Sequence, residues 1–295
     1  MSSDLQAIDR RIKSITGTKK ITSAMKLVSA AKFRKAKLSY DESKGYLNYI
    51  RQTIASILCH EENKDIVSAY ERKNDKIGRV CYIVITGNRG LCGGFNNSII
   101  QRTERQMSID PGRKELVTIG RKGYEYFNRR GLKIYGKYFE PLEKVTVNEV
   151  EEIIDPLLKR FEAGEIDQVK TIYTSFVNNL TQQVKCIKVL PFDVEDAMID
   201  CKLSSGELLN HDMEYEPSPT EILDYLLPRY LVMSLHSSII ESTTCEQSAR
   251  RNAMDNATNN AEDMIKELSL YYNRARQAAI TNEIIEVVSG SETQS

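Results

Sequence analysis

The stretch MDNATNNAEDMIKELSLYYNRARQA, residues 254–278, carries the strongest periodic signal in this chain of 295 residues. Its apolar and small residues recur at alternating spacings of three and four, which is typical of a helix that packs against another helix. These residues are Met254, Ala257, Ala261, Met264, Leu268, Tyr271, Ala275 and Ala278. No glycine lies between 220 and 289, so we expect one helix over 220–290 that stops near Ser289–Gly290.

The N-terminal segment shows a second seam of the same kind. The apolar positions before Gly17 are Leu5, Ile8, Ile12 and Ile15, and those after it, in a shifted phase, are Ile21, Met25 and Val28. No proline interrupts the first 58 residues, and small side chains crowd the middle of this segment, where another backbone can approach closely. We therefore expect one long helix over 1–58.

The two terminal helices are expected to pair with each other, because each has a single apolar seam. An antiparallel coiled coil formed by 1–58 and 220–290 would extend about 80–105 Å. If both helices leave a common base, Met25 faces Ala253, and the last turns after Ala278 project beyond the partner helix. That tip carries Ile280, Ile284, Ile285, Val287 and Val288. An exposed apolar tip of this kind predicts a surrounding protein partner.

The middle of the chain, 78–219, has the pattern of an α/β domain. Strands are predicted at Val80–Ile85, Glu115–Ile119, Leu132–Tyr138, Val169–Thr174 and Gln183–Val189, and helices near Phe95–Met107, Lys122–Arg129 and Val147–Phe161. Strands that alternate with helices indicate a Rossmann-like domain with a largely parallel sheet. Polar residues 59–77 form a predicted linker, the polar stretch 194–218 leads out of the domain, and 291–295 are a predicted flexible tail.

Composition excludes several classes of protein. The longest apolar run, Val80–Ile85, is far shorter than the roughly 20 residues that a membrane-spanning helix needs. The N-terminus lacks the layout of a secretory signal, so we expect a soluble, cytoplasmic protein, or one attached to a membrane only through partners. The six cysteines and three histidines are scattered, which disfavours zinc and redox sites. No catalytic constellation, metal site or cofactor site can be assembled from the sequence, which argues against an enzyme.

The net charge of zero, from 41 basic and 41 acidic residues, conceals two opposed segments. Ten basic residues and no acid lie between Arg10 and Lys37, whereas acids exceed bases from Pro219 to the end. Three interpretations of the basic run remain open: an arm that binds nucleic acid, a surface for an acidic protein partner, or a solvated helix face. Aromatic residues that stack on bases are scarce there, which disfavours binding of single strands.

A glycine-rich turn, TGNRGLCGG at 86–94, follows the first predicted strand and precedes a helix. This position suits a phosphate-binding turn. However, no Lys-Ser/Thr pair follows the glycines, and their spacing is not that of a dinucleotide fingerprint. A structural turn or an interface loop is the favoured interpretation, with nucleotide binding as the alternative, and a reactive Cys92 thiol lacks a nearby histidine base.

Three blocks of sequence resemble the gamma subunit of F-type ATP synthases. The first comprises IKSI at 12–15 and TKKITSAMKLVSAAKFR at 18–34, and the second is RGLCGGFN at 89–96. The third joins EQSAR at 246–250, Ala253-Met254 and ATNNA at 257–261 to YNRARQAAIT at 272–281 and Glu283. The blocks occur in the family's order and cover both ends and the middle of the chain.

The resemblance implies a non-catalytic rotor. The helix pair would be the shaft inside three alpha and three beta subunits, and the α/β domain would be the foot, bound to the epsilon subunit and the membrane ring of c subunits. Met25 and Arg250 would lie near an acidic segment of the catalytic subunits. The upper contacts would be Arg276, Gln277, Thr281 and Glu283, and Tyr215 and Glu216 would approach the c ring.

The implied function is to couple ion flow through the c ring to conformational cycling of the beta subunits, with no cofactor. The implied location is peripheral, on the cytoplasmic face of the bacterial plasma membrane. Two alternatives come from the residues alone: a nucleotide-binding α/β enzyme that uses the glycine-rich turn, and a basic coiled-coil protein that binds nucleic acid.

Overall fold

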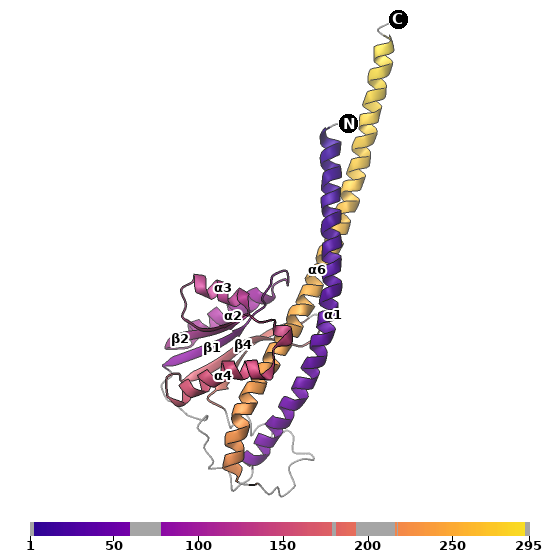
Figure 1. The fold of residues 1–295 in the computed structure, drawn as a ribbon. Coiled ribbons are helices and arrows are strands. Elements are labelled where there is room, and N and C mark those ends of the chain that lie inside the picture. The colour runs from indigo at the N-terminus through magenta and orange to yellow at the C-terminus, as the bar shows by residue number, and fades with distance from the viewer. Residues whose placement is uncertain (1–2, 60–77, 179–180, 193–215, 217, 293–295) are drawn as a thin grey trace. The chain divides into compact units, whose positions relative to one another are not determined.

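A computed structural model describes residues 3–59, 78–178, 181–192, 216 and 218–292 (Figure 1). One long helix lies at each end, α1 over Ser3–Cys59 and α6 over Pro219–Glu292, as the periodicity predicts. The predicted stop at Ser289–Gly290 is wrong, because α6 continues through both residues. A glycine costs a helix only about 1 kcal/mol relative to alanine, which does not by itself end one. The predicted linker 59–77 and the stretch 194–218 lie almost entirely outside the described residues.

The chain divides into two compact units. One contains residues 1–31 and 250–295, and the other contains residues 32–249. Both α1 and α6 run through the two units without a break, so each unit contains part of both helices.

The larger unit contains a five-stranded sheet in the order β3-β2-β1-β4-β5. The strands are β1 Arg79–Ile85, β2 Arg113–Ile119, β3 Ile134–Tyr138, β4 Gln168–Phe176 and β5 Gln182–Leu190. Three of the four pairings are parallel, and β5 returns antiparallel to β4. The helices are α2 Phe95–Ile109, α3 Arg121–Arg129 and α4 Val147–Glu162, with a short 3-10 helix, η2, at Leu142–Lys144. The predicted α/β domain with a largely parallel sheet is confirmed.

Alternate residues of β1 enter two cores, because successive side chains of a strand point to opposite faces. Cys81, Ile83 and Ile85 pack with α4 and with residues 231–239 of α6. Val80, Tyr82 and Val84 pack with α2 and α3 on the other face. Figure 1 shows α4 on one side of the sheet and α2 and α3 on the other. The sheet is therefore covered on both faces, as parallel sheets require.

A third core joins the two long helices within the larger unit. Ile50, Ile54 and Ile57 of α1 are buried against Leu223 and Leu227 of α6. These residues continue the spacing of three and four, so the helix pair extends down to the end of α1. No helix in the described ranges has a segment long and apolar enough to cross a membrane.

Asp110, just after α2, is expected to make the stability of the larger unit sensitive to acid. Burial would raise the pKa of this carboxyl, but hydrogen bonds from Lys170, Tyr82 and Gln106 outweigh it and hold the pKa below its ordinary value. The Lys170 Nζ–Asp110 Oδ2 distance is 2.7 Å and the Tyr82 hydroxyl donates at 2.5 Å. A lowered pKa stabilises the fold above the ordinary value near 4, and this contribution is lost as pH falls below it.

The Asp110→Asn variant should therefore lose about 2 kcal/mol at pH 7, because it leaves Lys170 without its buried counter-charge. Denaturant unfolding at pH 7 and at about pH 3.5 measures this. The difference between variant and parent should shrink at the lower pH. An equal difference at both pH values would contradict the assignment.

Candidate functional site: the helix pair and the glycine-rich loop

The helix pair of the smaller unit is joined by polar contacts. The Thr258 hydroxyl donates to Thr22 Oγ1 at 2.8 Å, Lys26 Nζ lies 2.6 Å from Asp255 Oδ1, and Lys19 pairs with Glu262 at 3.4 Å. As the residue number increases along α1, the number of the contacting residue in α6 decreases, so the two helices are antiparallel as predicted. The register differs, because the predicted pairing places Ser23 opposite Asp255, whereas Lys26, three positions later, contacts it. The predicted facing of Met25 and Ala253 is therefore wrong by two to three residues.

The sequence suggested that the apolar seam of α1 shifts phase after Gly17. This prediction is wrong. Thr22 and Ser29 are 8% and 2% exposed, whereas Ile21 and Val28 are 62% and 56% exposed. The spacing that begins at Leu5 thus continues through polar residues. The reason is geometric: a glycine inside a continuous helix leaves its periodicity unchanged, so position rather than hydrophobicity decides which side faces the partner.

The seam of α6 is buried only in part. Met254 and Ala261 are 5% exposed, but Met264 and Tyr271 are exposed, contrary to the prediction. The apolar tip is confirmed where side chains are described, because Ile280, Ile284 and Ile285 are all exposed. Together with Ile21, Leu27 and Val28 of α1, these side chains leave the smaller unit with unusually many exposed large apolar residues.

The residues that the resemblance singles out lie on different parts of this pair. Met25 is half-buried in α1, and Arg250 is buried at 8% exposure in α6. Arg276, Gln277 and Thr281 are exposed, and the Thr281 hydroxyl donates to the Gln277 carbonyl at 2.9 Å, one turn earlier. The side chain of Glu283 and the whole of Tyr215 lie outside the described residues. Glu216 is exposed.

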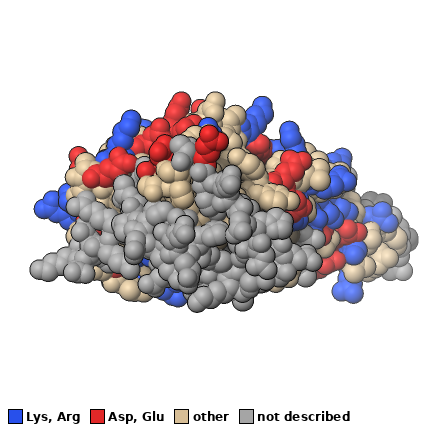
Figure 2. Space-filling view, turned by 90° about the horizontal axis from the view of Figure 1, so that it is seen from below, with Lys and Arg blue, Asp and Glu red and all other residues tan. Residues whose placement is uncertain are grey.

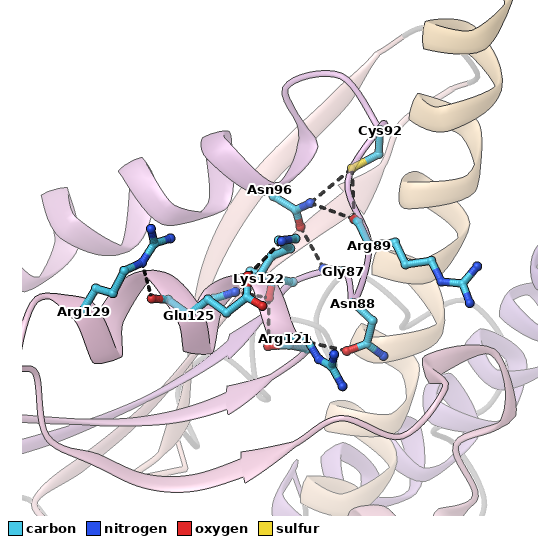
Figure 3. Close-up of polar contacts among 12 residues, drawn as sticks. Gly87, Asn88, Arg89, Cys92, Asn96, Arg121, Lys122, Glu125 and Arg129 are labelled. Atoms are coloured by element: carbon cyan, nitrogen blue, oxygen red, sulfur yellow. Dashed lines mark hydrogen bonds and ion pairs between the residues drawn. The ribbon is translucent and has the colours of Figure 1, made fainter. Parts of the chain in front are cut away.

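Hydrogen bonds to residues of α2 and α3 hold the glycine-rich loop in shape (Figure 3). The Gly87 N–H donates to Asn96 Oδ1 at 2.8 Å, and Asn96 Nδ2 donates to the Arg89 carbonyl and to Cys92 Sγ. Asn88 accepts from the backbone N–H of Arg121 at 2.9 Å. A phosphate-binding turn needs backbone N–H groups that are free to bind a ligand. The Gly87 N–H is already occupied and the loop is fixed to α2 and α3, as expected of a structural turn or an interface loop.

Residues 89–91 and 93–94 of the loop are exposed. Arg89 extends away from the hydrogen-bonded part of the loop in Figure 3, and the neighbouring Leu91 is 64% exposed. The Cys92 thiol is buried and accepts a hydrogen bond from Asn96, so it is not an accessible nucleophile. At the other end of the turn, a Cβ on Gly87 would lie 2.7 Å from the Glu246 carboxylate. The Glu246 side chain of α6 therefore packs closely against this turn.

A buried polar segment of α6, residues 241–248, was not predicted from the sequence. Glu241 accepts hydrogen bonds from the Ser175 hydroxyl and the Phe176 N–H of β4, both at 2.8 Å, and from the Tyr40 hydroxyl of α1 at 3.3 Å. Burial first, and then the Glu241 charge, raise the pKa of Tyr40 to about 12. One carboxylate therefore joins α1, β4 and α6.

A second carboxylate makes a similar junction through η2. Glu143 Oε1 accepts from Lys32 Nζ of α1 at 2.8 Å and from Gln247 Nε2 of α6 at 2.9 Å. One feature of the sequence could have revealed both junctions: many polar residues lie close together around Glu241 and Gln247, within one long predicted helix. Polar residues in a helix usually indicate a solvated face, so periodicity alone did not distinguish this segment.

Comparison with known proteins gives a consistent result. The family model described as ATP synthase matches residues 4–293. The ATP synthase gamma chain of Ruminiclostridium cellulolyticum is 36% identical over 293 residues, and that of Alkaliphilus metalliredigens is 37% identical over 294, each covering 99% of both chains. The ATP synthase gamma chain, sodium ion specific, of Acetobacterium woodii is 36% identical, also over 99% of both chains.

Solved structures share the fold at lower identity. A chain of the Euglena gracilis mitochondrial ATP synthase rotor aligns with a TM-score of 0.67 and 15% identity, covering 94% of this chain and 99% of that one. A chain from the OSCP/F1/c-ring structure of the same enzyme gives 0.68 and 16%, covering 99% and 94%.

The family model and the sequence relatives define a class, the subunits of F-type ATP synthases, and the fold shared with the rotor structure agrees with it. The sequence relatives named above are ATP synthase gamma chains. The chain belongs to the ATP synthase gamma chain family, whose members are non-catalytic subunits of the membrane-peripheral sector of the F-type enzyme.

Proposed function

We propose that this chain is the central shaft of a rotary F-type ATP synthase and couples ion flow through a c ring to conformational cycling of three beta subunits. Its partners would be three alpha and three beta subunits around the helix pair, and an epsilon subunit and the c ring at the α/β domain. The shaft is asymmetric, so it makes different contacts with each beta subunit at any angle. Such differential contact free energy is what shifts a conformational equilibrium.

The observation that carries the proposal is the pair of carboxylate junctions in the larger unit. Glu241 joins α1 and α6 to β4, and Glu143 joins the same two helices to η2. A force applied to the sheet is therefore transmitted to both helices rather than to one. Ion flow supplies about 2.3 kcal/mol per charge per 100 mV, and this work must pass through these contacts.

The contact surfaces of the shaft are proposed from the residues that match the family. Met25 and Arg250 would meet an acidic segment of the catalytic subunits, which suits the ten basic residues between Arg10 and Lys37. Arg276, Gln277, Thr281 and Glu283 would form the upper contacts. The exposure of Gln277 and Thr281 on successive turns supports this, as do the exposed apolar side chains of the same tip.

The remaining assignments concern the other end of the molecule. Tyr215 and Glu216 would contact the c ring, and the exposure of Glu216 suits this role. We divide the chain by function into a shaft of 1–58 and 220–290, a linker of 59–77, a foot of 78–219 and a tail of 291–295. The assembled protein would lie on the cytoplasmic face of a bacterial plasma membrane, attached through its partners.

Met25→Lys is expected to reduce coupling with little effect on folding. The added cation would bind the proposed acidic segment too strongly at one angle and hinder rotation, whereas a half-buried position on an exposed helix tolerates the change at a cost below about 1 kcal/mol. Ion pumping per ATP hydrolysed, measured in vesicles with the assembled complex, should fall at least about twofold.

Met25→Gln is the matched control, because it adds polarity without charge and should retain pumping. Equal pumping by the lysine variant and the parent complex would refute the contact. Denaturant unfolding of the isolated chain should show similar midpoints for all three proteins, which separates loss of coupling from loss of structure.

The two alternatives make opposite predictions for the isolated chain. A nucleotide-binding enzyme would release heat on titration with ATP or NAD, and a nucleic-acid-binding protein would shift DNA in a steeply salt-dependent manner. The shaft should do neither and should copurify with a hexameric ATPase. Figure 2 shows both acidic and basic side chains on the described part of the face seen from below.

A further inference from the structure

A cavity of about 500 Å³ lies within the larger unit, between α1, the β4–β5 hairpin and α6. Its volume falls within the range of about 300–1,000 Å³ that is typical of sites for small molecules. The lining includes Tyr40 of α1, Lys185 of β5 and Tyr230 of α6, so the cavity touches all three elements. These are the same elements that surround the Glu241 junction.

Two pairs of aromatic rings form part of the wall of the cavity. The rings of Phe192 and Tyr230 pack edge to face with centroids 5.7 Å apart, and those of Tyr40 and Phe176 do so at 6.5 Å. All four residues line the cavity. Two aromatic pairs on different elements offer a flat apolar body more contact area than aliphatic side chains would.

Basic residues outnumber acids around the same cavity. Lys44, Arg51, Lys185 and Lys188 line it, and Glu241 is the one carboxylate among its described lining residues. The Glu241 carboxylate already accepts three hydrogen bonds from the protein. Within the described ranges, Lys44 contacts only the Tyr40 ring and Lys185 has no acidic partner. A concave surface with an excess of one charge concentrates the field and attracts ions of the opposite sign.

We propose that this cavity binds a small amphipathic anion, with its apolar or aromatic body between the two ring pairs and its acidic group at Lys44 and Lys185. The inference goes beyond the shaft function, which requires no ligand. An occupant would contact α1, the sheet and α6 together. Binding would therefore stabilise the joint through which the helices are held to the sheet, because a ligand that binds only the folded state adds to its stability.

The test uses the full chain and a probe with both required features, 8-anilinonaphthalene-1-sulfonate. N-phenyl-1-naphthylamine has nearly the same aromatic body without the sulfonate, and inorganic sulfate has the charge without the body. Fluorescence titration should show saturable binding of the sulfonate probe, about tenfold weaker binding of the neutral probe, and no displacement by millimolar sulfate. Binding of the sulfonate probe alone should weaken as salt is raised.

Two variants locate the probe. The double variant Lys44→Gln/Lys185→Gln should bind the sulfonate probe about tenfold more weakly and the neutral probe with unchanged affinity. Each exposed charge contributes modestly to binding of the sulfonate, and the variant removes both charges. Ser234→Trp, which places a ring in the cavity, should reduce binding of both probes. Lys114→Gln is the control, since this lysine lies at the start of β2, which β1 separates from β4 and β5 in the sheet, and does not line the cavity. Circular dichroism and thermal unfolding verify that each variant is folded.

Equal binding of the sulfonate probe to the parent and to the Lys44/Lys185 variant would overturn the proposal, because it would locate the probe on another apolar surface such as the exposed helix tip. Equal affinity for the charged and the neutral probe would overturn it as well. Absence of saturable binding to the folded parent chain would do the same. None of these results bears on the shaft function, which is tested separately by ion pumping.

Discussion

Glu241→Ala is expected to destabilise the larger unit by about 3–5 kcal/mol. The substitution removes the acceptor of the Ser175 hydroxyl, the Phe176 N–H and the Tyr40 hydroxyl, all of which point into a buried site. Glu241 itself is only 8% exposed, so water cannot easily replace the carboxylate. Each donor left unsatisfied costs about 1–3 kcal/mol. Denaturant unfolding of the isolated chain measures the loss, and the assembled complex should pump fewer ions per ATP.

Two further variants separate the contributions at this junction. Glu241→Gln keeps the shape and one acceptor oxygen, and should cost about half as much as alanine. Tyr40→Phe removes the longest of the three bonds and should cost about 1 kcal/mol. If Glu241→Ala unfolded at the same denaturant concentration as the parent, the junction would not hold the helices to the sheet.

The same junction predicts a response to alkali. Burial, followed by the Glu241 charge, raises the pKa of Tyr40 from about 10 to about 12. A raised pKa means that the neutral hydroxyl is favoured in the folded state, so its contribution is complete below pH 10 and is lost as pH rises towards 12. Tyr40→Phe should therefore show a weaker loss of stability than the parent between pH 10 and 12, as measured by denaturant unfolding.

Gly120→Ala should have the second large effect, a loss of about 4 kcal/mol or failure to fold. Gly120 follows β2 with a φ of +99°, a region that L-residues rarely adopt. A Cβ there would lie 1.9 Å from the Thr86 carbonyl oxygen, which belongs to the backbone and cannot move aside cheaply. The same glycine donates its N–H to the Tyr138 carbonyl at 2.8 Å, so displacement would also break the link to β3.

Gly131→Ala is the matched control, because it introduces the backbone strain of a positive φ without a steric clash of the added Cβ. Gly131 also has a positive φ, of +71°, but a Cβ would meet nothing within 4 Å. This variant should lose only about 1 kcal/mol, the cost of the left-handed conformation. Thermal unfolding of the three proteins compares them directly. Similar losses for both variants would mean that conformation alone, and not the contact with Thr86, decides the effect at Gly120.

Most of the architecture was predictable because its signals are local. The alternation of strands and helices predicted the sheet, and the fully buried Val80–Ile85 is its central strand. Scarcity of proline and glycine predicted one helix at each end, and the bounds of α1 and α6 agree to within a few residues. The resemblance of three sequence blocks indicated the family, and the curated gamma chains confirm it.

The details of the helix pair were less predictable. Hydrophobicity selected Ile21 and Val28 as the inward residues, but the continuous turn of the helix buries Thr22 and Ser29 in their place. The register also depends on contacts that no single helix encodes, such as Thr22 with Thr258. The apolar side chains that remain exposed, such as Ile21 and Val28, can contact another protein. The sequence of one chain does not contain that partner.

The sequence by itself determined the elements, their order and the family, because propensity and periodicity act over a few neighbouring residues. Only the tertiary structure decided that the polar segment around Glu241 is buried and that hydrogen bonds to α2 and α3 hold the glycine-rich loop. Both outcomes depend on groups far apart in the chain: Tyr40 and Ser175 meet Glu241, and Arg121 meets Asn88. A polar side chain becomes stable in a core only when such partners satisfy it, and that condition is met by the fold as a whole.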